Sequence, residues 1–337
     1  MIASHELLRE SQLDLVRARS DVKGLWVVVH AWGTIFAAMA MFVLFPNPIT
    51  YLLAVAIIGA RQLGLAILMH DGSHGILCKS PKLNMFLSQW LCAYPMMAET
   101  MAYRRYHLKH HAHTQQPEDP DLILSAPFPI TRKSFRRKMI RDLTGQTGYQ
   151  QRKAQIIAAF GSSDMAWSDR FRSFGDKLGR PLATHVLLLG LLAAVGYWYL
   201  YFILFLVPFM TWHMAITRIR NIAEHAMVPD GNDDFRNART TLAGPLMRAF
   251  VAPYWVNYHV EHHLLMWVPC YNLPQTRAFL IANGFGERME TAKNYFDIIK
   301  RATSKPDVDD QRGELVHNSR RRVAGSFGEG FSESDAA

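Results

Sequence analysis

The chain has 337 residues, of which 50% are hydrophobic, and it carries a formal net charge of +9 at pH 7. A mean hydropathy of only -0.02 hides long apolar runs that alternate with charged segments, a pattern typical of a membrane protein with a substantial aqueous part. The basic charge does not indicate nucleic-acid binding, because the cations lie beside the apolar runs, where juxtamembrane Lys and Arg are expected. The three cysteines form neither a CxxC pair nor an even disulfide set, so we expect free thiols.

The first apolar run extends from Leu25 to Phe45, contains no Lys, Arg, Asp or Glu, and is long enough as a helix to cross a bilayer. No cleavable signal peptide precedes it, so this run should itself serve as the membrane signal. Pro46-Asn47-Pro48 breaks the run, and a second one extends from Ile49 to Met69, which predicts a helical hairpin. We expect Arg61 in the second run to snorkel or to face the helix bundle.

A second hairpin is expected between Leu182 and about Thr217, a stretch that allows two crossings only if both helices are short. We place its turn near Gly196 to Tyr199, where clustered aromatic residues resemble an interfacial belt. Met85 to Met97 is apolar but too short to span, so it should lie in the interface or pack on the aqueous part. The hairpin tips lack Lys and Arg, whereas the N-terminal and central segments are rich in them, which predicts cytoplasmic termini and a cytoplasmic central segment.

These assignments predict an all-α membrane protein with four transmembrane helices in two hairpins and a cytoplasmic helical cap. The polar, Gly- and Ser-rich C-terminal end reads as a disordered tail. The expected segments are an N-terminal cytoplasmic segment (1–24), the first hairpin (25–69), a cap segment (70–181), the second hairpin (182–220), a second cap segment (221–303) and the tail (304–337).

Most of the 15 histidines occur at spacings that place side chains on one face of a helix. His70 and His74 form an HxxxH pair, while residues 107–111 (HLKHH) and 259–263 (HVEHH) each present positions i, i+3 and i+4. Three short helices could therefore direct eight imidazoles at one volume. A single HxxxH is a weak signal, but this set, all on one predicted side of the membrane, indicates a metal site.

The number of imidazoles points to more than one ion, because zinc sites close at four ligands and no single ion accepts eight or nine. Imidazole alone does not distinguish Zn, Fe, Cu and Ni. His70 directly follows the second apolar run, and His225 comes about two turns after the last, which places ligands at the cytoplasmic membrane surface. A reactive carbon partway along a lipid chain could reach such a site.

The ordered boxes HDGSH, HLKHH and HVEHH resemble the membrane fatty acid desaturase and hydroxylase superfamily over roughly Leu25 to Pro274. In that family the box histidines ligate two non-haem irons and O₂ is the co-substrate. Members related to acyl-CoA desaturases add a histidine after the last span and, four residues earlier, an asparagine that acts through water, a form that residues 221–225 (NIAEH) share. The metal-binding residues that the resemblance implies are His70, His74, His107, His110, His111, His225, His259, His262 and His263, with Asn221 acting through water.

The expected reaction is the desaturation of a fatty acyl (lipid) chain with O₂ and two electrons. The first box is HxxxH rather than the HxxxxH of animal stearoyl-type enzymes, and the third begins with His rather than the Gln of front-end desaturases. Because no HPGG haem motif occurs, electrons should come from a separate ferredoxin, rubredoxin or cytochrome b5. Asp119-Pro120-Asp121 also resembles carotenoid ketolases and hydroxylases, so hydroxylation or ketolation of a lipid or carotenoid stays open.

Several other residues near the boxes have two alternative structural roles each. Trp255, Tyr258 and Trp267 either wall a substrate channel or pack as ordinary aromatic residues. Two alternative functions are a membrane metal transporter, which would hold its ions near the bilayer midplane, and a hydrolase with a surface zinc pair. The carboxylates that either orient a metal-bound ring or belong to solvated faces and turns are Asp71, Asp119, Asp121, Glu224 and Glu261.

Overall fold

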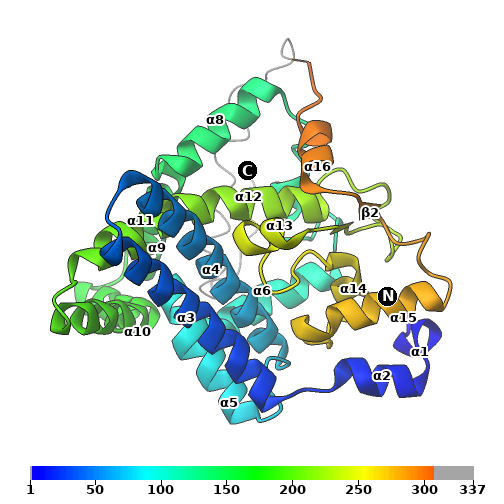
Figure 1. The fold of residues 1–337 in the computed structure, drawn as a ribbon, viewed down its shortest axis with the longest axis horizontal. Helices are drawn as coiled ribbons and strands as arrows, with labels where there is room; N and C mark the ends of the chain where they lie inside the picture. Colours follow the sequence, from blue (N-terminus) through cyan, green and yellow to red (C-terminus); the bar gives the residue numbers. More distant parts are fainter. Residues whose placement is uncertain (1, 307–337) are drawn as a thin grey trace.

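The computed structural model describes residues 2–306, and their regular secondary structure is almost entirely helical (Figure 1). Short π- or 3-10-helical turns occur at η1 (Leu87–Ala93), η2 (Tyr94–Met96), η3 (Tyr201–Leu206) and η4 (Cys270–Asn272), and the strands β1 (Thr240–Thr241) and β2 (Thr291–Ala292) pair in parallel. The α-helices are α1 (Ser4–Leu7), α2 (Glu10–Arg17), α3 (Asp21–Leu44), α4 (Pro48–His74), α5 (Pro81–Phe86), α6 (Thr100–Ala112), α7 (Leu122–Ser125), α8 (Arg132–Leu143), α9 (Gln146–Ala159), α10 (Trp167–Ala194), α11 (Val207–Met210), α12 (Trp212–His225), α13 (Pro245–Phe250), α14 (His259–Leu264), α15 (Leu273–Ala282) and α16 (Tyr295–Ala302). The expected tail lies, from residue 307 on, outside the described residues.

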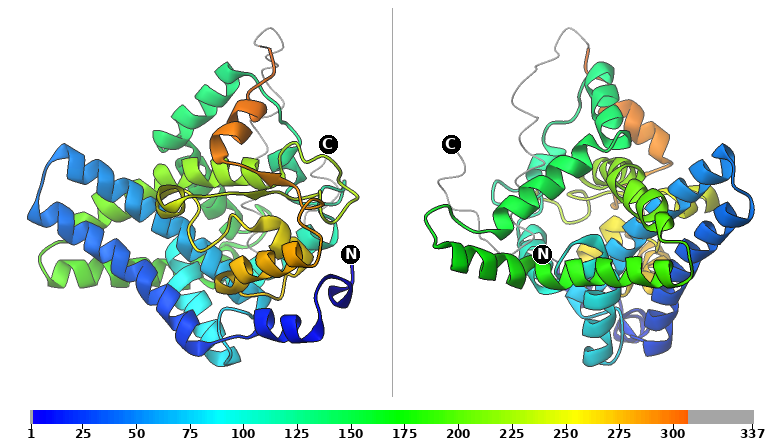
Figure 2. Two further views of the ribbon diagram at one scale, coloured as in Figure 1. Left: turned by 45° about the vertical axis from the view of Figure 1, so that its right-hand side comes forward. Right: turned by 90° about the vertical axis from the view of Figure 1, so that its left-hand side faces the viewer.

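Helices α3 and α4 form the expected first hairpin. The α3 helix ends at Leu44, and Asn47 caps the start of α4 by accepting hydrogen bonds from the backbone N–H groups of Ile49 and Thr50, with Pro48 at the first helical position. Figure 2 shows this turn and the turn after α10 projecting on the same side of the molecule. The predicted hairpin at the Pro-Asn-Pro sequence is confirmed.

The α4 helix is longer than expected at its C-terminal end. It continues without a break through the first histidine box and ends at His74, where Gly75 adopts the left-handed conformation (φ 75°) that stops a helix. The expectation of a separate short helix for the first box is therefore wrong. The apolar run and the first histidine box form one continuous helix, and the box occupies the last turns of that helix.

Three helical segments are long and apolar enough to cross a membrane, namely Asp21–Leu44, Pro48–His74 and Tyr201–His225. The third consists of η3, α11 and α12 in succession. The expected third crossing corresponds to the C-terminal half of α10, which ends at Ala194 and is followed by a turn at Gly196 (φ 82°), as placed from the sequence. The N-terminal half of α10 is polar, so four crossings remain a prediction.

Helix α4 is the centre of the packing. Of its most apolar window, 72% is buried, against 33% for α3 and 39% for Tyr201–His225. The expected apolar segment from Met85 to Met97 forms α5, η1 and η2 and packs on α4, with Ser88 of η1 directly against Gly72. Arg61 is buried and donates a hydrogen bond to the carbonyl of Ala249 at 2.8 Å, which confirms that it faces the bundle.

Candidate metal centre

Four helices carry the predicted histidines to one place. His70 and His74 come from the end of α4, and His225 is the last residue of α12. The second box lies on α6, whose start is capped by Glu99, and the third box forms most of α14. Each box presents its imidazoles on one helix face, as the i, i+3, i+4 spacing predicts.

All nine predicted histidines converge in two adjacent groups, and the ring nitrogens within each group lie within 4.8 Å of one another. Boxes two and three contribute to both groups, so α6 and α14 connect them. The larger group contains His70, His74, His107, His111 and His262, and the smaller contains His110, His225, His259 and His263.

The ring nitrogens that face one another within each group are better arranged to bind a cation than to hydrogen-bond to one another. His111 Nε2 lies 2.9 Å from His107 Nε2 and 3.0 Å from His262 Nε2, which is also 3.0 Å from His70 Nε2. A neutral imidazole has one N–H and one lone pair, so such a cluster leaves lone pairs pointing at lone pairs. His74 is buried, and neither of its ring nitrogens has a hydrogen-bond partner among the described residues. A metal ion at the centre of each group would satisfy these orphaned acceptors.

The protonation state of the rings also suits metal binding. Burial, reinforced by neighbouring imidazoles, lowers the pKa of His107, His111 and His262 well below the usual value in the larger group. The same causes lower the pKa of His259 and His263 in the smaller group. These rings are therefore neutral at neutral pH, which is the form that ligates a metal.

Carboxylates bind the outward nitrogens of two rings. His110 Nδ1 donates to buried Asp119 at 2.8 Å, and His70 Nδ1 donates to Asp71 at 3.1 Å. Such a bond fixes the tautomer that leaves Nε2 free to face the group. Asp119 also accepts hydrogen bonds from the backbone N–H groups of Gln115 and Asp121, so it is both a turn residue and a ring partner.

The remaining carboxylates have other partners. Glu224 pairs with Arg220, and one of its oxygens is 3.6 Å from His259 Nε2. Glu261 accepts from Arg277 and from the Thr240 hydroxyl, and Asp121 accepts from the Tyr106 hydroxyl: these two brace α14 and the segment after α6. Of the five carboxylates singled out in the sequence, Asp71 and Asp119 contact a ring nitrogen most closely.

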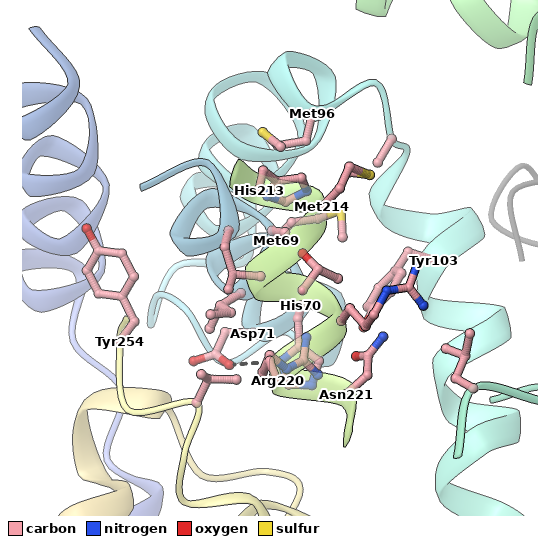
Figure 3. Close-up of a pocket in the computed structure, with 18 of the residues that line it drawn as sticks. Met69, His70, Asp71, Met96, Tyr103, His213, Met214, Arg220, Asn221 and Tyr254 are labelled. Atoms are coloured by element: carbon pink, nitrogen blue, oxygen red, sulfur yellow. Dashed lines mark hydrogen bonds and ion pairs between the residues drawn. The ribbon is translucent and has the colours of Figure 1, made fainter. Parts of the chain in front are cut away.

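A cavity of about 230 Å³ opens beside the histidines (Figure 3). His70, His259 and His262 lie on its wall, together with Asn221, which is one helical turn before His225. Asn221 thus lies beside the site where the resemblance places it. Most of the remaining lining residues are apolar, among them Ile67 of α4, Phe209 of α11 and Leu273 of α15.

Of the two alternatives for the aromatic residues around the third box, the structure favours ordinary packing over a place on the cavity wall. Tyr254 lines the cavity, whereas Trp255, Tyr258 and Trp267 do not. The backbone explains the difference, because Tyr254 and Trp255 both adopt positive φ values (49° and 58°), which no periodicity predicts. Trp267 packs instead against the His74 ring, with centroids 5.8 Å apart.

Sequence reasoning also missed the methionines on the cavity wall, Met69, Met96 and Met214. They belong to three elements separated by long stretches of chain, so no local pattern marks them. Flexible, polarizable methionines fill irregular apolar space and suit an aliphatic ligand.

Long apolar helices and two buried polyhistidine groups define a membrane-type helical protein with a centre suited to metal ions. The sequence profile of the fatty acid desaturase family matches residues 46–287, and the chain belongs to this family. The matched region contains every predicted histidine.

Two characterised proteins resemble the chain over most of its length. Dihydrorhizobitoxine desaturase of Bradyrhizobium elkanii is 28% identical over 282 residues, which cover 77% of this chain and 76% of that protein. Beta-carotene ketolase of Paracoccus sp. (strain PC1) is 26% identical over 256 residues, covering 75% of this chain and 87% of the ketolase. The chain is thus an oxygenase-type member of the desaturase family, similar to one desaturase and one ketolase.

Proposed function

We propose that the protein desaturates an aliphatic chain with O₂ and two electrons at a centre of two iron ions. The observation that carries the proposal is the pair of adjacent, buried groups of five and four imidazoles. The family match and a relative named as a desaturase favour oxidation over metal transport or hydrolysis.

The larger group would hold one iron and the smaller the other, with Asn221 acting through a water. Bound iron would supply the redox chemistry. In the overall reaction O₂, two external electrons and two protons combine with two hydrogens from adjacent substrate carbons, which gives a double bond and two waters. Imidazole ligands suit iron, and a buried site limits access of bulk water to the reaction.

The protein's own residues would orient the rings and hold the substrate. Asp119 and Asp71 hold His110 and His70 through their Nδ1 protons, so that Nε2 faces inward. The apolar part of the cavity wall would bind an aliphatic chain next to His70 and His262 and exclude water from it.

The second candidate reaction is the insertion of oxygen into a lipid or carotenoid, as hydroxylation or ketolation. A relative named as a beta-carotene ketolase specifically favours it. The two reactions use the same centre and differ in whether a second hydrogen or an oxygen atom is transferred.

Mass spectrometry of lipids and carotenoids from cells that express the protein separates these reactions. We expect a product two hydrogens lighter than its precursor, formed by the wild type and not by His262→Ala. A product heavier by one oxygen would indicate hydroxylation instead of desaturation, and a product with one added oxygen and two fewer hydrogens would indicate ketolation. His113→Ala is a matched control, because His113 ends α6 but belongs to neither histidine group.

We also propose four crossings in two hairpins, with the termini and the histidines on the cytoplasmic side, where a separate ferredoxin, rubredoxin or cytochrome b5 would deliver electrons. The cation-rich segments beside the apolar helices support this orientation. Accessibility of single cysteines placed at the α3–α4 turn and in α8 tests it, because only the first should react with an impermeant reagent from the outside.

A further inference from the structure

The cavity extends well beyond the histidines. Figure 3 shows it beside α12, from His70 and Asn221 at one end to His213 and Met96 at the other, with Met214 on the wall. Asn221 and His213 are eight residues apart on one helix, so the two ends lie about 12 Å apart at the rise of an α-helix. The cavity therefore has a far end, at His213 and Met96. It is separated from the histidines of the two groups by a distance that an aliphatic chain could span.

Arg152 of α9 lines this far end. Its guanidinium carbon is 5.1 Å from the ring centroid of Phe209, and that centroid is 5.5 Å from the ring of His213. Gln155, one turn further along α9, donates to the carbonyl of Met97 at 2.6 Å. Both contacts place α9 against the end of the cavity that lies opposite the histidines.

The Arg152 guanidinium has no ion-pair partner within residues 2–306, and its Nη1 is a buried donor without an acceptor. Arg218, another residue of the cavity wall, does have a partner, because the Asp142 carboxylate accepts its hydrogen bonds at 2.5 and 2.9 Å. Burial lowers the pKa of Arg152 to about 10, which leaves it charged at neutral pH. The Arg152 side chain is partly buried. A partly buried cation without a counter-charge among residues 2–306 is costly, and it calls for an anion from outside this part of the chain.

A second unsatisfied donor lies on the same cavity. The hydroxyl of Thr217, one turn beyond His213 on α12, is buried and has no hydrogen-bond partner in the part of the chain that the structure describes. A guanidinium and a hydroxyl without acceptors on one cavity match the oxygens of a carboxylate or phosphate.

We propose that Arg152 and Thr217 bind the anionic group of an amphipathic substrate, whose aliphatic part lies along the methionines and whose reacting carbon reaches the histidines. This inference rests on the proposed function and specifies its substrate class. The substrate then enters with a free acidic group at one end, and the distance from Arg152 to the histidines selects which carbon reacts.

The test is the binding of decanoate and of its uncharged methyl ester to the full-length protein in a nonionic detergent, measured by calorimetry. We expect Arg152→Met to weaken decanoate binding at least tenfold and to leave the ester unaffected. Thr217→Val should act in the same direction to a smaller extent. Lys153→Met is the matched control, because Lys153 is the exposed neighbour on α9 and its loss changes the net charge equally.

Three results would overturn the inference. The first is equal binding of decanoate by the wild type and Arg152→Met. The second is an equal loss of binding in Arg152→Met and Lys153→Met, which would indicate a general effect of net charge. The third is a ligand-free Arg152→Met protein that melts several degrees lower. The last would assign Arg152 a structural role. Since binding is measured without turnover, iron content and product formation still test the proposed function separately.

Discussion

At the residue scale, the histidine spacing predicted that the imidazoles within each box share a helix face, because positions i, i+3 and i+4 lie on the same side of a helix. The inclusion of His225 came from the family resemblance, and the structure places it with the others. What the spacing did not specify was how the boxes divide. His107 and His111 join one group while His110, between them in sequence, joins the other. That division depends on how α6 and α14 approach each other, which is a tertiary property.

The outer partner of His110 gives a prediction. Asp119→Asn keeps an oxygen for the turn but removes the carboxylate charge that holds Nδ1–H, so we expect metal affinity to fall by about tenfold to a hundredfold. Competition with a chromophoric chelator measures it. Glu118→Gln, an exposed neighbour, is the control, and equal affinities for both variants would contradict a role for Asp119.

The neutral rings predict how stability depends on pH in the metal-free protein. In the folded state, burial lowers the pKa of His107, His111, His259, His262 and His263 below the unfolded value near 6.5. The unfolded chain therefore binds more protons below that pH. The contribution of these rings to the free energy of unfolding is fully present above about pH 6.5. It falls as the pH is lowered below that value, by up to about 1.4 kcal/mol per pH unit for each ring.

Thermal melts of the metal-free protein from pH 8 to pH 5 check this dependence, a range above the titration of ordinary carboxylates at about pH 4. We expect Tm to be constant at the alkaline end and to drop below about pH 6.5. A Tm that stays level or rises toward pH 5 would show that these rings are not buried neutral.

At the element scale, the first hairpin could be predicted because Pro46-Asn47-Pro48 ends one helix and begins the next through local backbone chemistry. The end of α4 could not be predicted, because the end of an apolar run does not have to be the end of the helix. The apolar run stops at Met69, but the helix continues to His74. The segment from Val207 to Thr211 also departs from one regular helix, at Thr211 (φ -121°, ψ -86°).

Close packing of η1 on α4 requires a glycine. A Cβ at Gly72 would lie 2.1 Å from the Cβ of Ser88, and the neighbour is too rigid to move away cheaply. We expect Gly72→Ala to destabilise the protein by about 1–3 kcal/mol, typical of overpacking, and to lower metal content because Gly72 lies between His70 and His74.

The measurement is Tm and retained metal in detergent. Gly33→Ala on α3 is the matched control, since nothing lies within 4 Å of a Cβ there. A Gly72→Ala protein as stable and as metal-rich as Gly33→Ala would show that η1 adapts freely to a larger residue.

At the scale of the whole molecule, composition and apolar runs predicted a helical membrane protein, which agrees with three helices long enough to cross a membrane and with the family match. The large aqueous part stays a prediction. The cavity could not be predicted, because its walls come from α4, η2, α9 and α12, which meet only in the folded chain. The role of Arg152 could not be predicted for the same reason, because it depends on the lack of a counter-charge around this side chain among residues 2–306.

The fold brings the ends of α4 and α12 together with α6 and α14, and the central claim is that this arrangement exists to hold two metal ions. The most direct measurement is the iron content of the purified protein by elemental mass spectrometry. The variants His262→Ala and His113→Ala are measured in the same way. We expect two irons per chain in the wild type and in His113→Ala, and a loss in His262→Ala. A wild-type protein without bound transition metal, or a His262→Ala protein with unchanged iron, would contradict the claim.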